Sequence, residues 1–147
     1  MLELLRDAGV DAAGIDKDAD RVAAAMSKGL TATTAEAHSY LDDKVCTFDG
    51  IFLRHVIEHF DGPDGVLLLY LCRRALTPGG TIVAITPNFG VAQVAQEIFW
   101  LDITHRRPYP LALLRRILSS MGIGIRELGV RDGEPEQDAF IVGRVPE

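Results

Sequence analysis

The sequence predicts an α/β fold in which a doubly wound, mostly parallel sheet ends in an antiparallel pair of strands. Two observations indicate this fold. Short apolar strands alternate with helical segments over residues 11–87, and strands joined through helices usually run parallel. Two strand-like segments, residues 123–130 and 139–145, then flank a polar loop that contains glycine and proline, which is typical of an antiparallel pair. A chain of 147 residues fits one domain, so we expect residues 1–147 to form a single unit.

Composition and charge exclude several classes of protein. The chain is 48% hydrophobic and 24% charged, as globular proteins are. Its net charge of −6 argues against a general binder of nucleic acid or of anionic membranes. No apolar run approaches the roughly 18 residues of a membrane span. Cys46 and Cys72 lack the spacing of a metal site. We therefore expect a cytoplasmic protein with free thiols, and a homodimer is left open.

The first segments are expected to form a helix, a strand and a second helix. Residues 1–8 have the apolar spacing of a helix, and residues 12–15 form an apolar strand that ends in Asp16. Asp18 can cap the helix predicted over residues 19–28, and Gly29 can end it. A carboxylate at the end of such a strand can accept hydrogen bonds from ribose hydroxyls. The alternative is that Asp16 only begins the helix cap.

A buried strand with a polar carboxyl end is the next informative stretch. Residues 31–34 form a short β-like run, and residues 51–53 form an apolar strand. Directly after that strand come four ionisable side chains: Arg54, His55, Glu58 and His59. Open α/β sheets bind their ligands at the carboxyl ends of strands, so these side chains are candidates for a site.

The second half of the chain predicts two strong helices and a buried strand. Residues 66–76 form a strongly apolar helix, residues 77–80 a turn, and residues 81–85 a buried strand. A helix is compatible with residues 91–99, and an amphipathic helix is expected over residues 111–121.

The segment between those helices is aromatic, basic and rich in proline. It contains His105, Arg106, Arg107 and Tyr109, a combination that suits a loop over a pocket. The alternative is a connector whose histidine and arginines cap neighbouring carbonyls.

His55, Glu58 and His59 also match the inverted zinc-protease pattern. That pattern requires a long helix that presents both histidines to one metal, and a third ligand downstream. Asp61-Gly62-Pro63 interrupts any helix just after His59. We therefore expect no metal, and the histidines could instead orient a turn.

Three motifs together resemble the class I S-adenosylmethionine (SAM) dependent methyltransferases, in particular their small-molecule branch. The motifs are Phe48-Asp49-Gly50-Ile51 followed by His55-Val56-Ile57-Glu58-His59, then Leu76-Thr77-Pro78-Gly79-Gly80, and finally Asp102-Ile103-Thr104-His105-Arg106-Arg107-Pro108-Tyr109. The resemblance covers nearly the whole chain. It implies a Rossmann-like fold, SAM as cofactor, and methyl transfer to a small-molecule or glycan-type acceptor. The negative charge of the chain argues against nucleic acid as a partner.

The resemblance also implies four residues at the cofactor. Asp16 would bind the ribose, and Arg54 and His55 would line the cofactor edge at the fourth strand of the family sheet. Glu36 would face the adenine amino group, where family members usually have Asp. For Glu36 the alternative is a solvated loop acid.

The acceptor site is implied by the aromatic and basic segment. His105 is expected to be the general base, because a near-neutral imidazole can take a proton as the methyl group arrives. Arg106, Arg107 and Tyr109 are expected to hold an anionic or sugar-like acceptor.

The sequence also departs from the family at its start. Family members carry a first strand and a Gly-rich loop before the helix with which this sequence begins. We therefore expect an N-terminally incomplete domain that binds SAM weakly or not at all. The alternative function is a non-catalytic, degenerate methyltransferase-like binding module.

Overall fold

The computed structural model describes residues 1–131 and 137–147, and the chain divides into two compact units. The smaller unit is Met1–Asp43 and the larger unit is Lys44–Glu147. The central part of the predicted terminal loop, residues 132–136, lies outside the described residues. No helix in the described residues is long and apolar enough to span a lipid bilayer.

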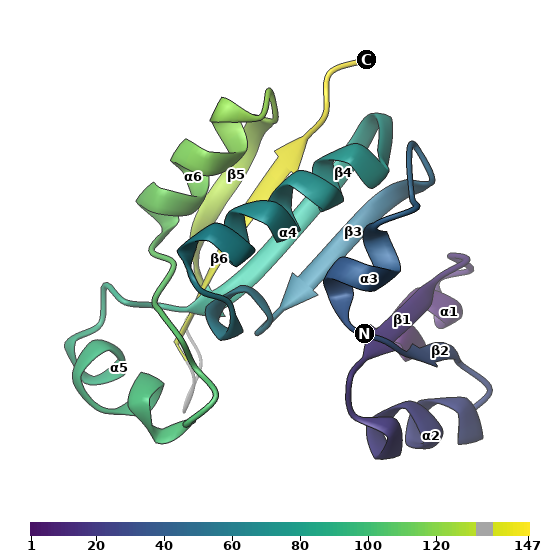
Figure 1. The fold of residues 1–147 in the computed structure, drawn as a ribbon, viewed down its shortest axis with the longest axis horizontal. Helices are drawn as coiled ribbons and strands as arrows, with labels where there is room; N and C mark the ends of the chain where they lie inside the picture. The colour runs from purple at the N-terminus through teal and green to yellow at the C-terminus, as the bar shows by residue number, and fades with distance from the viewer. Residues whose placement is uncertain (132–136) are drawn as a thin grey trace. The chain divides into compact units, whose positions relative to one another are not determined.

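The smaller unit is a two-stranded parallel sheet with three helices (Figure 1). Ala13 pairs with Thr31 and Asp16 with Thr34, so both strands end at the same edge. The elements are α1 Leu2–Asp7, β1 Ala13–Asp16, α2 Ala19–Ser27, β2 Thr31–Thr34 and α3 Ala37–Leu41.

The predicted start and end of α2 are confirmed. The Asp18 carboxylate accepts hydrogen bonds from the backbone N–H groups of Asp20 (2.9 Å) and Arg21 (3.3 Å), which satisfies donors that a helix start leaves unpaired. Gly29 has φ +72°, a conformation that ends a helix and that glycine adopts without steric cost.

The larger unit is a four-stranded mixed sheet in the order β3-β4-β6-β5. Strands β3 and β4 are parallel, whereas β6 runs antiparallel to both β4 and β5. The predicted α/β fold, with parallel strands followed by a terminal antiparallel pair, is therefore confirmed. The elements are β3 Phe48–Arg54, the 3-10 turn η1 Ile57–His59, α4 Gly62–Ala75, β4 Leu76–Pro87, α5 Ala92–Gln96, the 3-10 turn η2 Ile98–Leu101, α6 Leu111–Ser120, β5 Gly124–Arg131 and β6 Asp138–Arg144.

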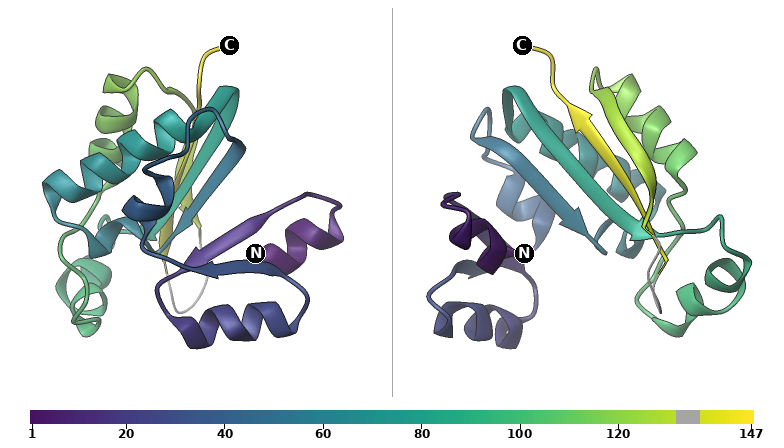
Figure 2. Two further views of the ribbon diagram at one scale, coloured as in Figure 1. Left: turned by 45° about the vertical axis from the view of Figure 1, so that its right-hand side comes forward. Right: turned by 180° about the vertical axis from the view of Figure 1, so that it is seen from behind.

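Helices α4 and α6 lie on the same face of this sheet, as Figures 1 and 2 show. The core of the larger unit forms between these helices and the strands. Complete burial of one large aliphatic side chain contributes roughly 1.5–3 kcal/mol to the free energy of folding. Side chains with no exposed surface include Leu68, Leu69 and Cys72 of α4, Ile82 of β4, and Leu114 and Leu118 of α6.

Helix α4 begins at Gly62, four residues before the predicted start, and two further segments differ from the sequence prediction in kind. The predicted turn at residues 77–80 lies inside the span of β4. Phe48 pairs with Leu76, and Gly50 pairs with Thr81. The four residues between those partners form a local insertion, so the turn interrupts the register without ending the strand. The helix expected over residues 91–99 is also divided, into α5 and η2.

Tyr109 anchors the chain that enters α6 against the start of α4. Its ring is buried, and its hydroxyl donates to the carbonyls of Phe60 (3.1 Å) and Asp61 (2.9 Å). Burial raises the pKa of this phenol above its ordinary value. Gly65 makes the contact possible, because a Cβ at that position would overlap the Tyr109 hydroxyl.

We predict that Gly65→Ala destabilises the larger unit by about 1–3 kcal/mol, because the added methyl group displaces the Tyr109 ring from a filled core. Urea unfolding measures this change. Gly50→Ala is the matched control, since the nearest atom to its added Cβ is 3.9 Å away. Equal destabilisation by both substitutions would contradict the packing described here.

A second prediction concerns the two thiols. Cys72 is fully buried, and burial raises its pKa to about 12, whereas Cys46 is exposed. Only a thiolate reacts readily. Iodoacetamide should therefore modify Cys46 in the native protein and Cys72 only after unfolding, as peptide mass spectrometry would show. Modification of Cys72 at the same rate as Cys46 under native conditions would contradict this prediction.

Candidate functional site

In the larger unit, the candidate site lies at the carboxyl ends of the parallel strands β3 and β4, where α/β sheets bind ligands. His55 follows β3 directly and has φ +50°, which is uncommon for any residue except glycine. Such a conformation costs about 1–3 kcal/mol and persists only where its surroundings hold it. The His55 N–H donates to the Ile85 carbonyl at 3.0 Å, which ties the turn to β4.

This backbone conformation places the His55 ring between two carboxylates. Nδ1 lies 3.1 Å from Glu58 Oε1, and Nε2 lies 3.2 Å from Asp138 Oδ1. The second pair is close enough for an ion pair but does not have hydrogen-bond alignment. Glu58 is fully buried, and Thr86 Oγ1 donates to its Oε2 at 3.4 Å. The imidazole and the hydroxyl together fix the direction of the Glu58 carboxylate.

The segment of residues 102–109 docks on the backbone of Glu58. The N–H groups of Arg106 (2.8 Å) and Arg107 (3.3 Å) both donate to the Glu58 carbonyl. As a result, the rings of His59 and His105 lie with their centroids 4.8 Å apart. The fold therefore brings together two histidine-containing motifs that lie far apart in the sequence.

The hydrogen bonds of His105 define its tautomer. Nδ1 lies 2.7 Å from the Phe99 carbonyl, which can only accept, so Nδ1 carries a hydrogen. In neutral imidazole Nε2 then has a lone pair. Nε2 lies 3.8 Å from Asp102 Oδ2. The Thr104 hydroxyl and its N–H hold the pKa of Asp102 below its ordinary value, so Asp102 is a carboxylate at neutral pH.

The remaining residues expected at the acceptor differ in exposure. Arg106 is exposed to solvent, whereas Arg107 is partly buried with its guanidinium 5.1 Å from the centre of the Tyr109 ring. Tyr109 itself was expected to bind the acceptor. Because its hydroxyl is used by two backbone carbonyls in the core, its role in the structure is to position the segment and support Arg107.

The residues expected at the ribose and adenine belong to the smaller unit. Asp16 ends β1, and its Oδ1 accepts from the Asp18 N–H at 2.9 Å. Its Oδ2 lies 3.9 Å from the exposed Arg21 guanidinium. The helix-cap role and the ribose role expected for Asp16 are therefore compatible, since Oδ1 shapes the turn and Oδ2 can accept a hydrogen bond from a hydroxyl. Glu36 is exposed at the start of α3.

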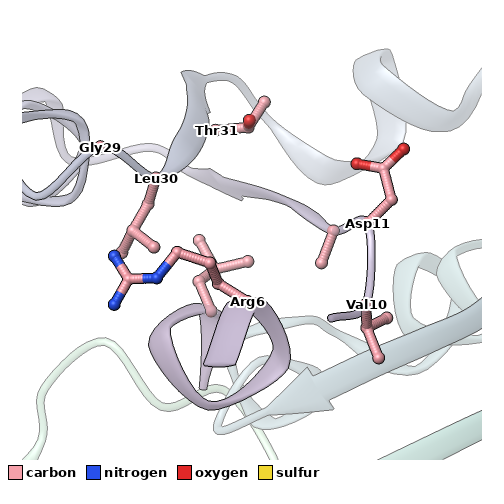
Figure 3. A pocket seen from close by; sticks show the side chains of 8 residues that line it. Arg6, Val10, Asp11, Gly29, Leu30 and Thr31 are labelled. Carbon is pink, nitrogen blue, oxygen red and sulfur yellow. The ribbon is translucent and has the colours of Figure 1, made fainter. Parts of the chain in front are cut away.

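Two shallow hollows lie on the smaller unit. One, of about 130 Å³, is lined by Arg6, Leu30 and Thr31 among others and lies at the amino ends of the strands (Figure 3). The other, of about 160 Å³, includes Asp16 and Arg21 and reaches the carboxyl end of β1. Ligand pockets usually have about 300–1,000 Å³, so neither hollow encloses a whole cofactor. Asp16 is among the residues that line the second hollow.

Sequence reasoning missed two buried partners of the site, Asp138 and Thr86. Asp138 begins β6, far from His55 in sequence, and no local motif marks it. Thr86 follows the predicted strand at residues 81–85, and its position at a carboxyl end was the available signal.

The chain matches the family described as "Methyltransferase domain" over residues 1–128. No curated protein matches it. Among solved structures, a SAM-dependent methyltransferase from Archaeoglobus fulgidus has 22% identity and a TM-score of 0.83, over 97% of this chain and 80% of that chain. A SAM-dependent methyltransferase from Methanosarcina mazei has 16% identity and a TM-score of 0.77, over 98% and 86%.

A third similar structure contains ligands. The 1,6-didemethyltoxoflavin-N1-methyltransferase of Burkholderia thailandensis, with bound 1,6-didemethyltoxoflavin and S-adenosylhomocysteine, has 12% identity and a TM-score of 0.75, over 99% of this chain and 65% of that chain. At these identities the likeness establishes the shared Rossmann-like α/β fold. Because the family match covers most of its length, the chain belongs to the SAM-dependent methyltransferase domain family.

Proposed function

We propose that this chain transfers a methyl group from SAM to a small-molecule or glycan-type acceptor. The observation that carries the proposal is the docked segment 102–109, which holds His105 and its Nε2 lone pair against His59, in the turn that follows β3, in a chain of this family. A structurally similar enzyme that acts on a small molecule, the didemethyltoxoflavin methyltransferase, supports the class of acceptor.

The cofactor contacts are proposed as follows. When bound, SAM supplies an electrophilic methyl group on a sulfonium, so the protein mainly provides binding and orientation. The Asp16 Oδ2 would accept the ribose hydroxyls, and the exposed Glu36 carboxylate would accept from the adenine amino group. Arg54, exposed at the end of β3, and His55, fixed by Glu58, would line the cofactor edge.

The acceptor chemistry is assigned to His105. As the new bond to carbon forms, the acceptor oxygen or nitrogen must lose its proton, and Nε2 is the atom that can take it. The Asp102 carboxylate, 3.8 Å away, would stabilise the resulting imidazolium. Arg106 and Arg107 would hold an anionic or sugar-like acceptor, with Tyr109 supporting the Arg107 guanidinium.

A second candidate is a cofactor-binding module without catalysis. The two candidates differ in turnover and not in the identity of the cofactor.

We predict that S-adenosylhomocysteine binds the chain weakly and that Asp16→Asn lowers this affinity about tenfold further, because a charged hydrogen-bond acceptor is lost. Isothermal titration calorimetry measures both affinities. Asp11→Asn is the matched control, since Asp11 lines the hollow at the other end of β1. Equal affinities for wild type and Asp16→Asn would remove Asp16 from the site. The same titration tests the expectation of weak binding, which an affinity like that of other family members would contradict.

Replacing His105 should lower turnover more than cofactor affinity. We expect His105→Gln to reduce kcat by about 10²–10⁴, because the amide can still donate to the Phe99 carbonyl but cannot take a proton at neutral pH. Formation of S-adenosylhomocysteine with a panel of phenols, sugars and small acids measures turnover, and His38→Gln on α3 is the control. Unchanged turnover would exclude His105 as the base. Absence of turnover in the wild type with every acceptor would favour the non-catalytic module.

A further inference from the structure

We propose that Glu58, His59 and His105 form a binding site for a divalent transition metal of the zinc type. One potential ligand atom from each of these residues lies within 4.8 Å of the other two. The sequence predicts no metal because His55 and His59 cannot share a long helix, and the structure agrees that they do not: His55 follows β3 and His59 ends η1. In the proposed site, His105 takes the place that His55 has in the zinc-protease pattern, and it belongs to a segment far along the chain.

The tautomer of His59 follows from its contact with Thr104. The Thr104 hydroxyl donates its single hydrogen to Asp102 Oδ1 at 2.6 Å. It must therefore accept at its contact with His59 Nδ1, at 2.9 Å, so Nδ1 carries the hydrogen. The lone pair of neutral His59 is then at Nε2.

His105 has the same arrangement, because its Nδ1–H is used by the Phe99 carbonyl. Within the residues that the structure describes, neither Nε2 atom takes part in a hydrogen bond; the nearest acidic partner is Asp102 Oδ2, 3.8 Å from His105 Nε2. Two neighbouring imidazoles thus each have Nδ1 fixed and Nε2 available. Metal-binding histidines typically show this pattern, in which the second nitrogen donates to a protein oxygen.

The carboxylate of the set is oriented in a comparable way. Glu58 is fully buried, with His55 Nδ1 on Oε1 at 3.1 Å and Thr86 Oγ1 on Oε2 at 3.4 Å. A carboxylate has about four lone-pair sites, so two contacts leave capacity for a metal. Every proposed ligand therefore has its own orienting partner, and metal-site ligands usually require such support.

Distances and charge fit a small cation. Ligands at about 2.0–2.2 Å from a tetrahedral zinc lie about 3.3–3.6 Å from one another. The ligand atoms of the three residues lie within 4.8 Å of one another, so each pair would close by about 1.5 Å at most. The carboxylates of Glu58 and Asp102 supply negative charge beside the two neutral rings. Imidazole with carboxylate suits zinc, cobalt and iron(II), whereas magnesium prefers a shell of oxygen atoms.

The site has one chemical consequence for methyl transfer, and this consequence alone rests on the proposed function. A cation and a proton compete for the same lone pair on His105 Nε2. Three protein ligands leave at least one position open on such a metal. In a metal-loaded chain that position would hold an acceptor hydroxyl, whose pKa the metal lowers.

The test is titration of the tag-free, chelator-treated full chain with zinc chloride, followed by calorimetry, and with cobalt chloride, followed by visible absorption. We expect one equivalent of each metal to bind and the cobalt form to show the absorption of a low-coordinate site. His59→Ala and His105→Ala should each weaken zinc binding at least about tenfold. His38→Ala, on α3, should leave it unchanged. Magnesium chloride should bind much more weakly than zinc.

Glu58→Gln keeps the volume of the buried side chain and serves as a second variant if an alanine variant does not fold, as judged by circular dichroism. It should also weaken zinc binding. No saturable zinc binding, or equal binding by wild type and the His59 and His105 variants, would overturn the proposal. The outcome is independent of the cofactor titration. A chain that binds zinc and not S-adenosylhomocysteine supports the metal site and contradicts the proposed function. A chain that binds S-adenosylhomocysteine and not zinc contradicts the metal site and leaves the proposed function in place.

Discussion

The structure of the larger unit depends on one buried residue, Glu58, whose two polar ends hold three parts of the chain together. Its carboxylate contacts His55 after β3 and Thr86 at the end of β4. Its backbone carbonyl accepts both N–H groups of Arg106 and Arg107. A buried carboxylate left without partners costs several kcal/mol. Its partners must therefore be in place, and the turn, the strand end and the docked segment form as one assembly.

Local signals account for what the sequence predicted. The acid that caps α2, the glycine that ends it and the apolar strands are encoded within a few residues, and the structure has them where the pattern indicates. The sequence also marked His55, Glu58 and His105 as polar residues near strand ends or in a ligand-type segment. These residues could be recognised as candidate site residues from the sequence because each belongs to a short motif.

Contacts between distant segments could not be read in the same way. Asp138 reaches His55 only because β6 pairs antiparallel to β4, and no local spacing encodes that pairing. Tyr109 belongs to a segment whose composition indicates a ligand loop, yet it is buried because Gly65 leaves room for its hydroxyl. The sequence predicted a turn at residues 77–80. The residues on both sides of it pair with β3, so they belong to one strand, β4.

The left-handed backbone conformation of His55 lowers the stability of the fold, while the side chain of the same residue supplies an imidazole to the site. Glycine would adopt φ +50° without the steric penalty that histidine pays in the folded state. It would also remove the imidazole that stands between Glu58 and Asp138. The backbone penalty at residue 55 is therefore offset by the contact that its imidazole makes with the buried Glu58 carboxylate. A descendant of this chain could replace His55 with glycine only if Glu58 lost its charge or gained another partner, so residues 55 and 58 should change together.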